Sequence, residues 1–551
     1  MGIEVSYEDQ IERKGGDVMR KRILATLLSV TMVAGLLTGC GSTSGGTTVE
    51  TESAATEDGE ATVDSASEGG AEIVIARPAD TVTLDPILAG VNEDIWVINL
   101  MLQGLTKSSA DGTAIEPCLA ESWDVSDDQM TYTFHVREGL KFSDGSDVTA
   151  EDWQYSLDRY LTAEESPWIG MVSMIDSAEA VDDTTVVITL NEVSPTFLAT
   201  SALFCMSVMP KAYCEEVGDE GIAKKPVGTG PFYLDEWVPG EKMVFVKNPY
   251  YWEAGLPKSD KITFNIVADD NTRIMQLQSG EADAITYVPA NRVAELDAMA
   301  GINVLAFDST ESRHVTVNNS VPALSDAKVR NALLMATDRE SLIQAVYYGN
   351  ATVATGLIGP AQPYYNSSIE PVPYDVEAAK ALLAETDYAD GFDVTIEIRS
   401  GNTNELQEAT MLKEQWSKIG VNLNIEQVDA STVVDHWYSM GFEMEITSLT
   451  SDTADTNQFA QGLCIADLKD CYHTLWSGEE QKKAEELAIA ARSEMDTTKR
   501  AELYNELQVI ASAENPVLPL YYIPFVVATS DKVTGFVQNP LGVYDFSELT
   551  K

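Results

Sequence analysis

The stretch SLTSDTADTNQF, Ser448 to Phe459, combines acidic, hydroxyl and amide side chains in a pattern that could bind a cation. It holds two carboxylates, Asp452 and Asp455, and contains no Lys or Arg of its own. A carboxylate that folding buries without a protein cation favours a positively charged partner that arrives from outside. The alternative is a solvated turn, because Asp and Asn are common turn residues.

The rest of the sequence offers little catalytic chemistry. No HExxH, GxSxG or GxxxxGK[ST] motif is present. GTGPF at Gly228–Phe232 lacks the following Lys of a phosphate-binding loop and predicts a tight turn. The cysteines and histidines have no zinc-type spacing. The four histidines form no close pair; they are His135, His314, His436 and His473. We therefore expect no enzyme activity, no bound metal and no cofactor.

Net charge narrows the class of ligand. The 551 residues include 88 Asp and Glu against 35 Lys and Arg, which gives a formal net charge of -53 at pH 7. Nucleic-acid binding needs clustered basic residues, so this class is excluded. The excess of acid favours a soluble body and cationic or zwitterionic ligands, although surface solvation alone can account for most of it.

The N-terminal region has the order of an export signal. Basic residues Arg20–Arg22 precede an apolar run, Ile23–Leu37, that is shorter than the roughly 20 residues of a membrane-spanning helix. The run ends in LTGC, whose last residue is Cys40. LTGC resembles the lipobox of bacterial lipoproteins, which implies a signal peptide at 19–39, cleavage before Cys40 and a diacylglycerol on its thiol.

The residues on either side of this signal have different expected roles. Residues 1–18 are polar and precede Met19. Codons for Lys14–Asp17 can spell a ribosome-binding sequence, so we expect translation to begin at Met19. Residues 40–71 are rich in Gly, Ser, Thr and acid and contain almost nothing to bury, which predicts a disordered tether.

Five cysteines remain if Cys40 carries lipid. Cys464–Cys471 and Cys205–Cys214 are the pairs that lie close enough in sequence to form local disulfides in an exported protein. Buried free thiols are the alternative, and the sequence leaves the choice open.

From Ala71 onward, strand and helix patterns alternate without an internal repeat, which predicts an α/β fold. Thr149 is expected to cap a helix over TAEDWQYSLDRYL. A helix pair is expected to end at Gly349, and a long helical region to follow Ser477. The run NPVLPLYYIPFVVATS predicts a buried or edge strand because prolines interrupt it. The other strong patterns are EIVIARPA, DDTTVVITLN and KITFNIVAD for strands, DVEAAKALLAET for a helix, and FDVTIEIRS to VNLNIEQVD for strand–helix–strand.

Four segments of the body are similar, in the same order, to the solute-binding lipoproteins of bacterial peptide importers. They begin with LAESWDVSDDQMTYTF, GTGPFYLDEWVPGEKM, VTVNNSVPALSDAKVR and RAELYNELQVIASAEN. The resemblance runs from about Ala71 to the C-terminus. It implies an oligopeptide or dipeptide ligand, a membrane permease with separate ATPase subunits as partner, and a place on the outer face of the cytoplasmic membrane. It also implies a monomer held to that membrane by lipid.

The resemblance implies a two-lobe, periplasmic-binding-protein-like (Venus-flytrap) α/β fold that closes around a ligand in its cleft. Lobe 1 would comprise residues 72–312 and a return segment, 515–551. An extra subdomain of lobe 1 would span about 112–224. Lobe 2 would comprise residues 313–514.

The resemblance also gives the acidic stretch a role. In the family, the loop after this strand carries an Asp that accepts the α-ammonium of the peptide, and Asp452 stands at the matching position. Asp455 is expected to cap or shape the loop. Leu449 and Thr456 replace the Trp and Pro that relatives commonly have, and these departures bear on the shape of the pocket.

Three further residues are candidate ligands. Dipeptide-binding members use an Arg after the preceding strand to hold the peptide carboxylate, and Arg399 occupies that place. The alternative for Arg399 is a surface residue at a strand end. Asn92 and Thr450 are candidates for polar contacts in the cleft.

Other functions are compatible with the same fold. One is the binding of a nickel chelate, haem, an oligosaccharide or an opine, and another is a surface sensor that feeds no permease. Nickel sites of the family tend to lack the amine-binding Asp, so Asp452 favours a peptide. Leu449 removes one aromatic platform on which a sugar could stack.

Overall fold

The structure is a computed structural model that describes residues 71–465 and 474–551. These residues belong to one compact unit, Glu68–Lys551. The predicted start at Met19, the signal peptide, Cys40 and the tether up to residue 70 lie outside the described residues. Among the helices that are described, none is both long enough and apolar enough to cross a bilayer.

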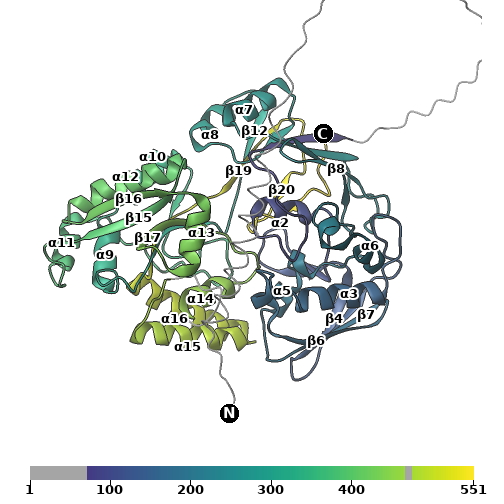
Figure 1. The fold of residues 1–551 in the computed structure, drawn as a ribbon, viewed down its shortest axis with the longest axis horizontal. Coiled ribbons are helices and arrows are strands. Elements are labelled where there is room, and N and C mark those ends of the chain that lie inside the picture. The colour runs from purple at the N-terminus through teal and green to yellow at the C-terminus, as the bar shows by residue number, and fades with distance from the viewer. Residues whose placement is uncertain (1–70, 466–473) are drawn as a thin grey trace, which may run out of the picture. The chain divides into compact units, whose positions relative to one another are not determined.

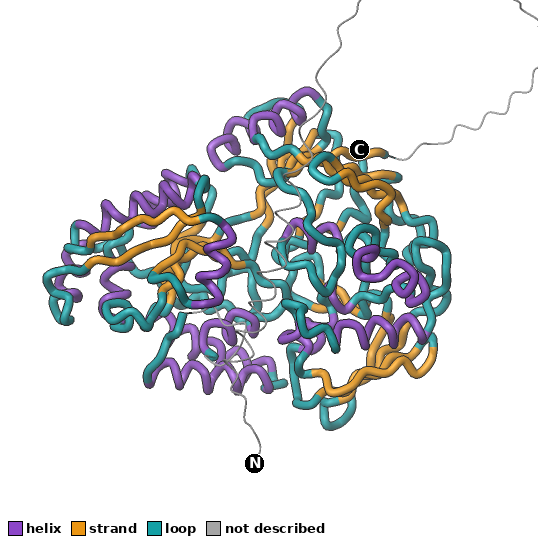
Figure 2. Tube along the Cα trace, viewed as in Figure 1, coloured by secondary structure: helices purple, strands orange, loops and turns teal. Residues whose placement is uncertain are grey.

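Sheet 1 is a mixed seven-stranded sheet at the centre of lobe 1 (Figures 1 and 2). Its order is β12-β19-β11-β1-β10-β9-β8. The predicted strand EIVIAR forms β1, which lies between two parallel neighbours and therefore buries side chains on both faces. The strands are β1 (Glu72–Arg77), β8 (Phe232–Val238), β9 (Lys242–Lys247), β10 (Lys261–Ile266), β11 (Ala284–Ile285), β12 (Ile302–Phe307) and β19 (Phe525–Ser530). Its helices are α7 (Asp270–Ser279), η2 (Ala290–Arg292) and α8 (Val293–Asp297).

Sheet 2 is the mixed six-stranded sheet of lobe 2, with the order β14-β18-β13-β17-β15-β16. The predicted strand–helix–strand unit is present as parallel β15 and β16 joined by α12. The strands are β13 (Ser312–Val317), β14 (Thr352–Val353), β15 (Asp393–Arg399), β16 (Asn422–Val428), β17 (Met444–Leu449) and β18 (Val517–Tyr522). The helices are α9 (Ala327–Met335), α10 (Arg339–Tyr347), α11 (Val376–Leu383), α12 (Thr403–Ser417), α13 (Ala430–Ser439), α14 (Asn457–Cys464), α15 (Glu479–Ser493) and α16 (Thr497–Glu514).

Sheet 3 is an antiparallel four-stranded sheet with the order β4-β5-β7-β6, and it lies within the predicted subdomain. Thr149 precedes α3 as predicted, and its backbone N–H and hydroxyl both donate to Asp152 Oδ2, at 2.9 and 2.7 Å. The strands are β4 (Ala120–Val125), β5 (Thr131–Val136), β6 (Ile175–Asp182) and β7 (Thr185–Leu190). The helices are α3 (Ala150–Leu161), α4 (Ile169–Val172), α5 (Phe197–Ser201), η1 (Phe204–Met206) and α6 (Lys211–Ile222).

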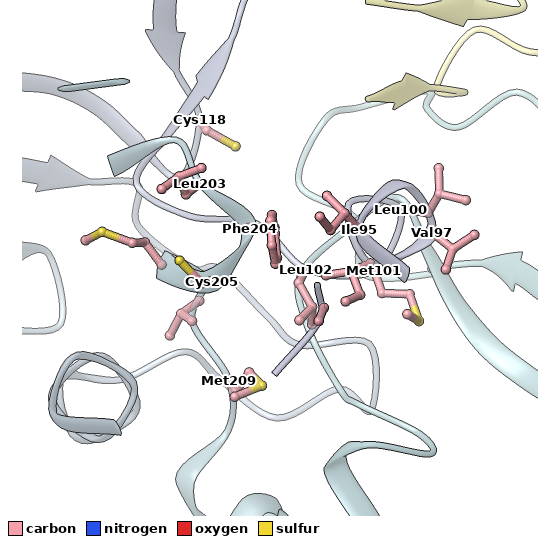
Figure 3. Close-up of a cluster of buried hydrophobic side chains, with 14 of the residues drawn as sticks. Ile95, Val97, Leu100, Met101, Leu102, Cys118, Leu203, Phe204, Cys205 and Met209 are labelled. Carbon is pink, nitrogen blue, oxygen red and sulfur yellow. The ribbon is translucent and has the colours of Figure 1, made fainter. Parts of the chain in front are cut away.

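Sheets 1 and 3 share one hydrophobic core. Phe245 of sheet 1 and Phe134 of sheet 3 are both fully buried in it, together with Trp153 of α3. Figure 3 shows part of this core, where α2 (Asn92–Ile98) and the residues after it face the segment that contains η1. The subdomain is therefore continuous with lobe 1 rather than a separately packed module.

The GTGPF segment packs against the chain that follows α2. Gly230 donates its N–H to Met101 O at 2.8 Å. A Cβ at Gly230 would lie 2.5 Å from Leu100 O, and one at Gly228 would lie 2.4 Å from Met101 O. Glycine is required at both positions because two backbones approach closely, so this segment is a packing element of lobe 1.

The chain crosses between sheets 1 and 2 at two short segments of the described residues, 308–311 and Ile523–Pro524. The first crossing lies just before the predicted boundary at 312. The second lies eight residues after the predicted boundary at 514–515, because the apolar run there is not one strand. It forms β18 in sheet 2 and β19 in sheet 1, and Pro524 stands between them without an N–H to continue a ladder.

Two small ribbons complete lobe 1. β2 (Thr106–Ser108) pairs with β3 (Ile115–Pro117), and β20 (Val537–Gln538) pairs with β21 (Tyr544–Asp545), each antiparallel. Both ribbons contribute residues to the cavity described next.

Candidate functional site

The acidic loop leaves the carboxyl end of β17, which is held between β13 and β15 in sheet 2. Ser451 is fully buried, and its N–H donates to Thr310 Oγ1 in the first crossing segment at 2.9 Å. Gln458 of α14 makes two hydrogen bonds with Asp452, the residue after Ser451. Its Nε2 donates to Asp452 Oδ2, and its Oε1 accepts from Asp452 N, both at 2.9 Å. The loop therefore presents Asp452 in a defined position.

Asp455 has a cation within the protein, contrary to the expectation that the acidic stretch is uncompensated. Arg500 of α16 donates to both of its carboxylate oxygens, at 2.6 and 2.9 Å. Asp455 Oδ1 also accepts from Asn457 N at 2.8 Å, at the start of α14. Asp455 thus shapes the loop, as expected, and the buried Arg500 neutralises it.

Asp452 is half-buried, and no Lys or Arg of the described residues lies within 4.0 Å of its carboxylate. Desolvation raises the pKa of this carboxyl from 3.8 to about 6, and the hydrogen bond from Gln458 works in the opposite direction. A carboxylate in this setting gains most from a cation that enters with a ligand.

Asp452 lines a cavity of about 260 Å³, which we call the Asp452 cavity. Its other lining residues belong to lobe 1: they come from α2 and the residues after it, the η1 segment, the two ribbons, Pro231 before β8, and the segment after β9 that holds Tyr251 and Glu253. Ile95 of α2 and the following Asn99 line the cavity, as do Phe204 and Ser207. The cavity therefore joins one carboxylate of lobe 2 to a largely preformed surface of lobe 1.

A second cavity, of about 710 Å³, lies at the crossing segments and is called the hinge cavity. Glu311, Ile523 and Pro524 of these segments line it. Its aromatic wall includes Trp96 and Tyr287, whose rings stack at 5.9 Å. Residues of lobe 2, among them Tyr347, Tyr348 and residues 401–404 at the start of α12, also line it.

The structure does not bring the other predicted ligand residues into the Asp452 cavity. Arg399 ends β15 with 46% of its side chain exposed, and its Nη1 lies 3.4 Å from Glu405 Oε1. Its backbone N–H also donates to Glu405 Oε2, so the first turn of α12 holds it away from either cavity. Asn92 begins α2 and Thr450 follows β17, both half-buried, and neither lines the cavity.

Two residues that sequence reasoning missed have buried hydroxyls with no hydrogen-bond partner among the described residues. Ser207 is 2% exposed and lines the Asp452 cavity, and Thr286 is 2% exposed and lines the hinge cavity. Unpaired buried polar groups are uncommon in folded proteins. A single Ser inside the apolar run FCMSVMP gives no signal of this kind, because the missing partner is a property of the tertiary structure.

The predicted disulfide between Cys205 and Cys214 is absent. Both are buried free thiols, and burial raises their pKa values to about 12 and about 11. Cys205 lies in η1 within the core, whereas the Cys214 thiol contacts the hydroxyl of Tyr155. Cys464 is also buried, and its predicted partner Cys471 lies outside the described residues, so that pairing stays a prediction.

Comparison with known proteins identifies the group to which this architecture belongs. The family described as bacterial extracellular solute-binding proteins, family 5 (middle part), matches residues 114–467. The chain belongs to this family. Members are solute-binding proteins, and within the described part of this chain no group of His, Cys, Asp and Glu side chains is arranged to hold a metal ion.

Family-5 relatives match nearly the full length of the body. The glutathione-binding protein GsiB of Escherichia coli O1:K1 is 31% identical over 485 residues, 87% of this chain and 94% of that protein. The dipeptide-binding protein of Escherichia coli K12 is 29% identical over 467 residues, 80% of this chain and 86% of that protein. The periplasmic binding protein DppA of Helicobacter pylori, in complex with the peptide STSA, superposes with a TM-score of 0.78 at 28% identity, covering 88% and 99% of the two chains.

Proposed function

We propose that this chain is the extracytoplasmic peptide-binding component of an ATP-driven importer, with Asp452 as the ligand of the peptide's α-ammonium. The observation that carries the proposal is a half-buried carboxylate that lines a cavity and has no Lys or Arg within 4.0 Å among the residues that the structure describes. Relatives that bind glutathione, dipeptides and the peptide STSA support a peptide as the ligand class.

Capture of the peptide uses both lobes. The peptide binds first to the cavity wall that lobe 1 provides, and its ammonium then pairs with Asp452 of lobe 2. Because both crossing segments are short, the lobes can rotate about them, and the ligand shifts the population toward the closed form. A membrane permease with separate ATPase subunits would bind the closed form and take up the peptide from it.

The location follows from the N-terminal segment. Cys40 carries a lipid, the tether links it to the body, and the monomeric protein stays at the outer face of the cytoplasmic membrane. Mass spectrometry of the intact protein made in a lipoprotein-processing host would show a diacylglycerol adduct on Cys40. An unmodified chain that begins before Cys40 would contradict this part of the proposal.

The deciding experiment compares free and blocked amino termini. Isothermal titration of the purified protein with trialanine and N-acetyl-trialanine is expected to show binding of the free form and at least a hundredfold weaker binding of the acetylated form. Mass spectrometry of ligands that co-purify with the undenatured protein would identify natural peptides. Equal affinity for both forms, or no peptide bound in either experiment, would overturn the proposal.

A further inference from the structure

The Asp452 cavity carries more negative charge than one α-ammonium can neutralise. Four of its lining residues are carboxylates: Asp452, Glu116, Glu253 and Asp545. Among the described residues that line it, Lys107 is the one Lys or Arg.

Lys107 has two acidic neighbours. Its Nζ lies 3.9 Å from Glu253 Oε1, and it is the cross-strand partner of Glu116 in the β2–β3 ribbon. Opposite residues of an antiparallel pair place their side chains on the same face, but among the described residues Glu253 is the one carboxylate that forms an ion pair with Lys107. The described residues provide Asp545 with hydrogen bonds from Ser547 but with no ion pair. The wall therefore keeps uncompensated negative charge after Asp452 has taken the amino terminus.

The rest of the cavity suits a long basic side chain. Ile95, Leu102 and Phe204 line it and are buried, so they can contact the methylene groups of a Lys or Arg. Glu116 and Asp545 are exposed, so each attracts a cation with the modest strength of a surface charge. Independently, the hydroxyl of Ser207 lines this wall and has no hydrogen-bond partner among the described residues, which favours a ligand that brings a polar group to this wall.

We propose that the Asp452 cavity selects peptides that carry a basic side chain near the amino terminus. This inference rests on the proposed function, in which Asp452 binds the α-ammonium. Glu116 and Asp545 attract the Lys or Arg side chain of the ligand, while Glu253 remains with Lys107. The substrate class is therefore short cationic peptides.

The test measures the affinities of the full-length protein for four peptides at one ionic strength. They are Ala-Ala-Ala, Lys-Ala-Ala, Ala-Lys-Ala and Ala-Glu-Ala, all with free amino termini. At least one Lys peptide is expected to bind about fivefold more tightly than Ala-Ala-Ala, the effect of one partly exposed ion pair, and Ala-Glu-Ala more weakly. In the double variant Glu116→Gln/Asp545→Asn, the preference for Lys over Ala should fall toward one.

A matched control separates the cavity from the charge of the whole protein. Glu121 and Glu138 are exposed on lobe 1 and line neither cavity, so Glu121→Gln/Glu138→Gln removes the same charge elsewhere. This control should keep the wild-type preference for Lys. An equal loss in both double variants, or no preference in the wild type, overturns the inference alone. Failure of the wild type to bind any of the four peptides overturns the proposed function, and this inference with it.

Discussion

Asp452 and Asp455 stand three positions apart on one loop and differ in what neutralises them. Asp455 has two short hydrogen bonds from Arg500. Asp452 has one hydrogen bond from the neutral amide of Gln458 and faces a cavity. The difference depends on α16, which brings the Arg500 guanidinium to Asp455, while Asp452 faces the cavity.

Removal of the Asp452 charge is expected to weaken peptide binding strongly. In Asp452→Asn the loop keeps its size, but the α-ammonium of the ligand is buried without a counter-charge, which costs about 3–5 kcal/mol, or a few hundred-fold or more in affinity. Isothermal titration with trialanine measures this loss. Glu426→Gln, which removes an exposed charge of β16 away from both cavities, should bind as the wild type does. Unchanged affinity in Asp452→Asn would exclude Asp452 as the amine ligand.

Peptide affinity should also fall in mild acid. The pKa of the Asp452 carboxyl in the free protein is raised to about 6, and the ligand binds its ionised form. At pH 5 about one molecule in ten is ionised, whereas the α-amino group of the peptide, with a pKa of about 8, stays charged. Affinity should therefore decrease roughly tenfold between pH 7 and pH 5, and the profile of Asp452→Asn should be flatter. A wild-type profile that is flat over this range would contradict the charge pairing.

Elements that lie far apart in the sequence hold the loop in place. Arg500 of α16 reaches Asp455 across 45 positions and also donates to Ala491 O near the end of α15 at 2.9 Å. Tyr364 and Tyr504 place their rings against the guanidinium, at 5.4 and 5.2 Å from the ring centroids. Helices α15 and α16 thus support the loop that carries Asp452 and Asp455.

Loss of this support should reduce the stability of the folded protein. Arg500→Met leaves Asp455 as an uncompensated buried charge and should lower the free energy of unfolding by about 3–5 kcal/mol. The double variant Asp455→Asn/Arg500→Met should recover part of that loss. Denaturant titration measures both. Lys380→Met, which breaks an exposed ion pair with Glu377, is the control and should change little. Equal effects of Arg500→Met and Lys380→Met would refute the supporting role.

Local patterns predicted most of the elements but few of the contacts. EIVIAR, the Thr149 cap and the β15–α12–β16 unit were predictable because periodicity and capping are local properties. The division of the last apolar run between sheets 1 and 2 was not predictable, because an apolar run does not show which strands it will pair with. The same limit applies to Arg399, whose pairing with Glu405 depends on where α12 begins, and to Arg500, which is remote in sequence from Asp455.

At the scale of the whole molecule, the crossings connect to one buried charge network. Arg313 begins lobe 2 just after the first crossing, and its Nη2 lies 2.6 Å from Glu408 Oε2 of α12. Tyr521, just before the second crossing, donates its hydroxyl to the same carboxylate. Residues next to both crossings on the lobe-2 side are therefore fastened to a single helix, α12.

Ligand binding should therefore make the molecule more compact without changing its secondary structure. Small-angle X-ray scattering is expected to show a smaller radius of gyration when trialanine saturates the protein, with an unchanged far-ultraviolet circular dichroism spectrum. Asp452→Asn should require a much higher peptide concentration for the same change. A radius of gyration that does not respond to saturating peptide would argue against closure.

The Asp452 cavity takes a single side chain from lobe 2 and all its other lining residues from lobe 1. If a peptide binds there as proposed, lobe 2 recognises its amino terminus and lobe 1 recognises its neighbouring side chains. Substitutions in the β2–β3 ribbon or near η1 would then change which side chains of the peptide are preferred. The pairing of the amino terminus with Asp452 would stay the same. With such a division, a few substitutions in lobe 1 are enough to change the peptide specificity.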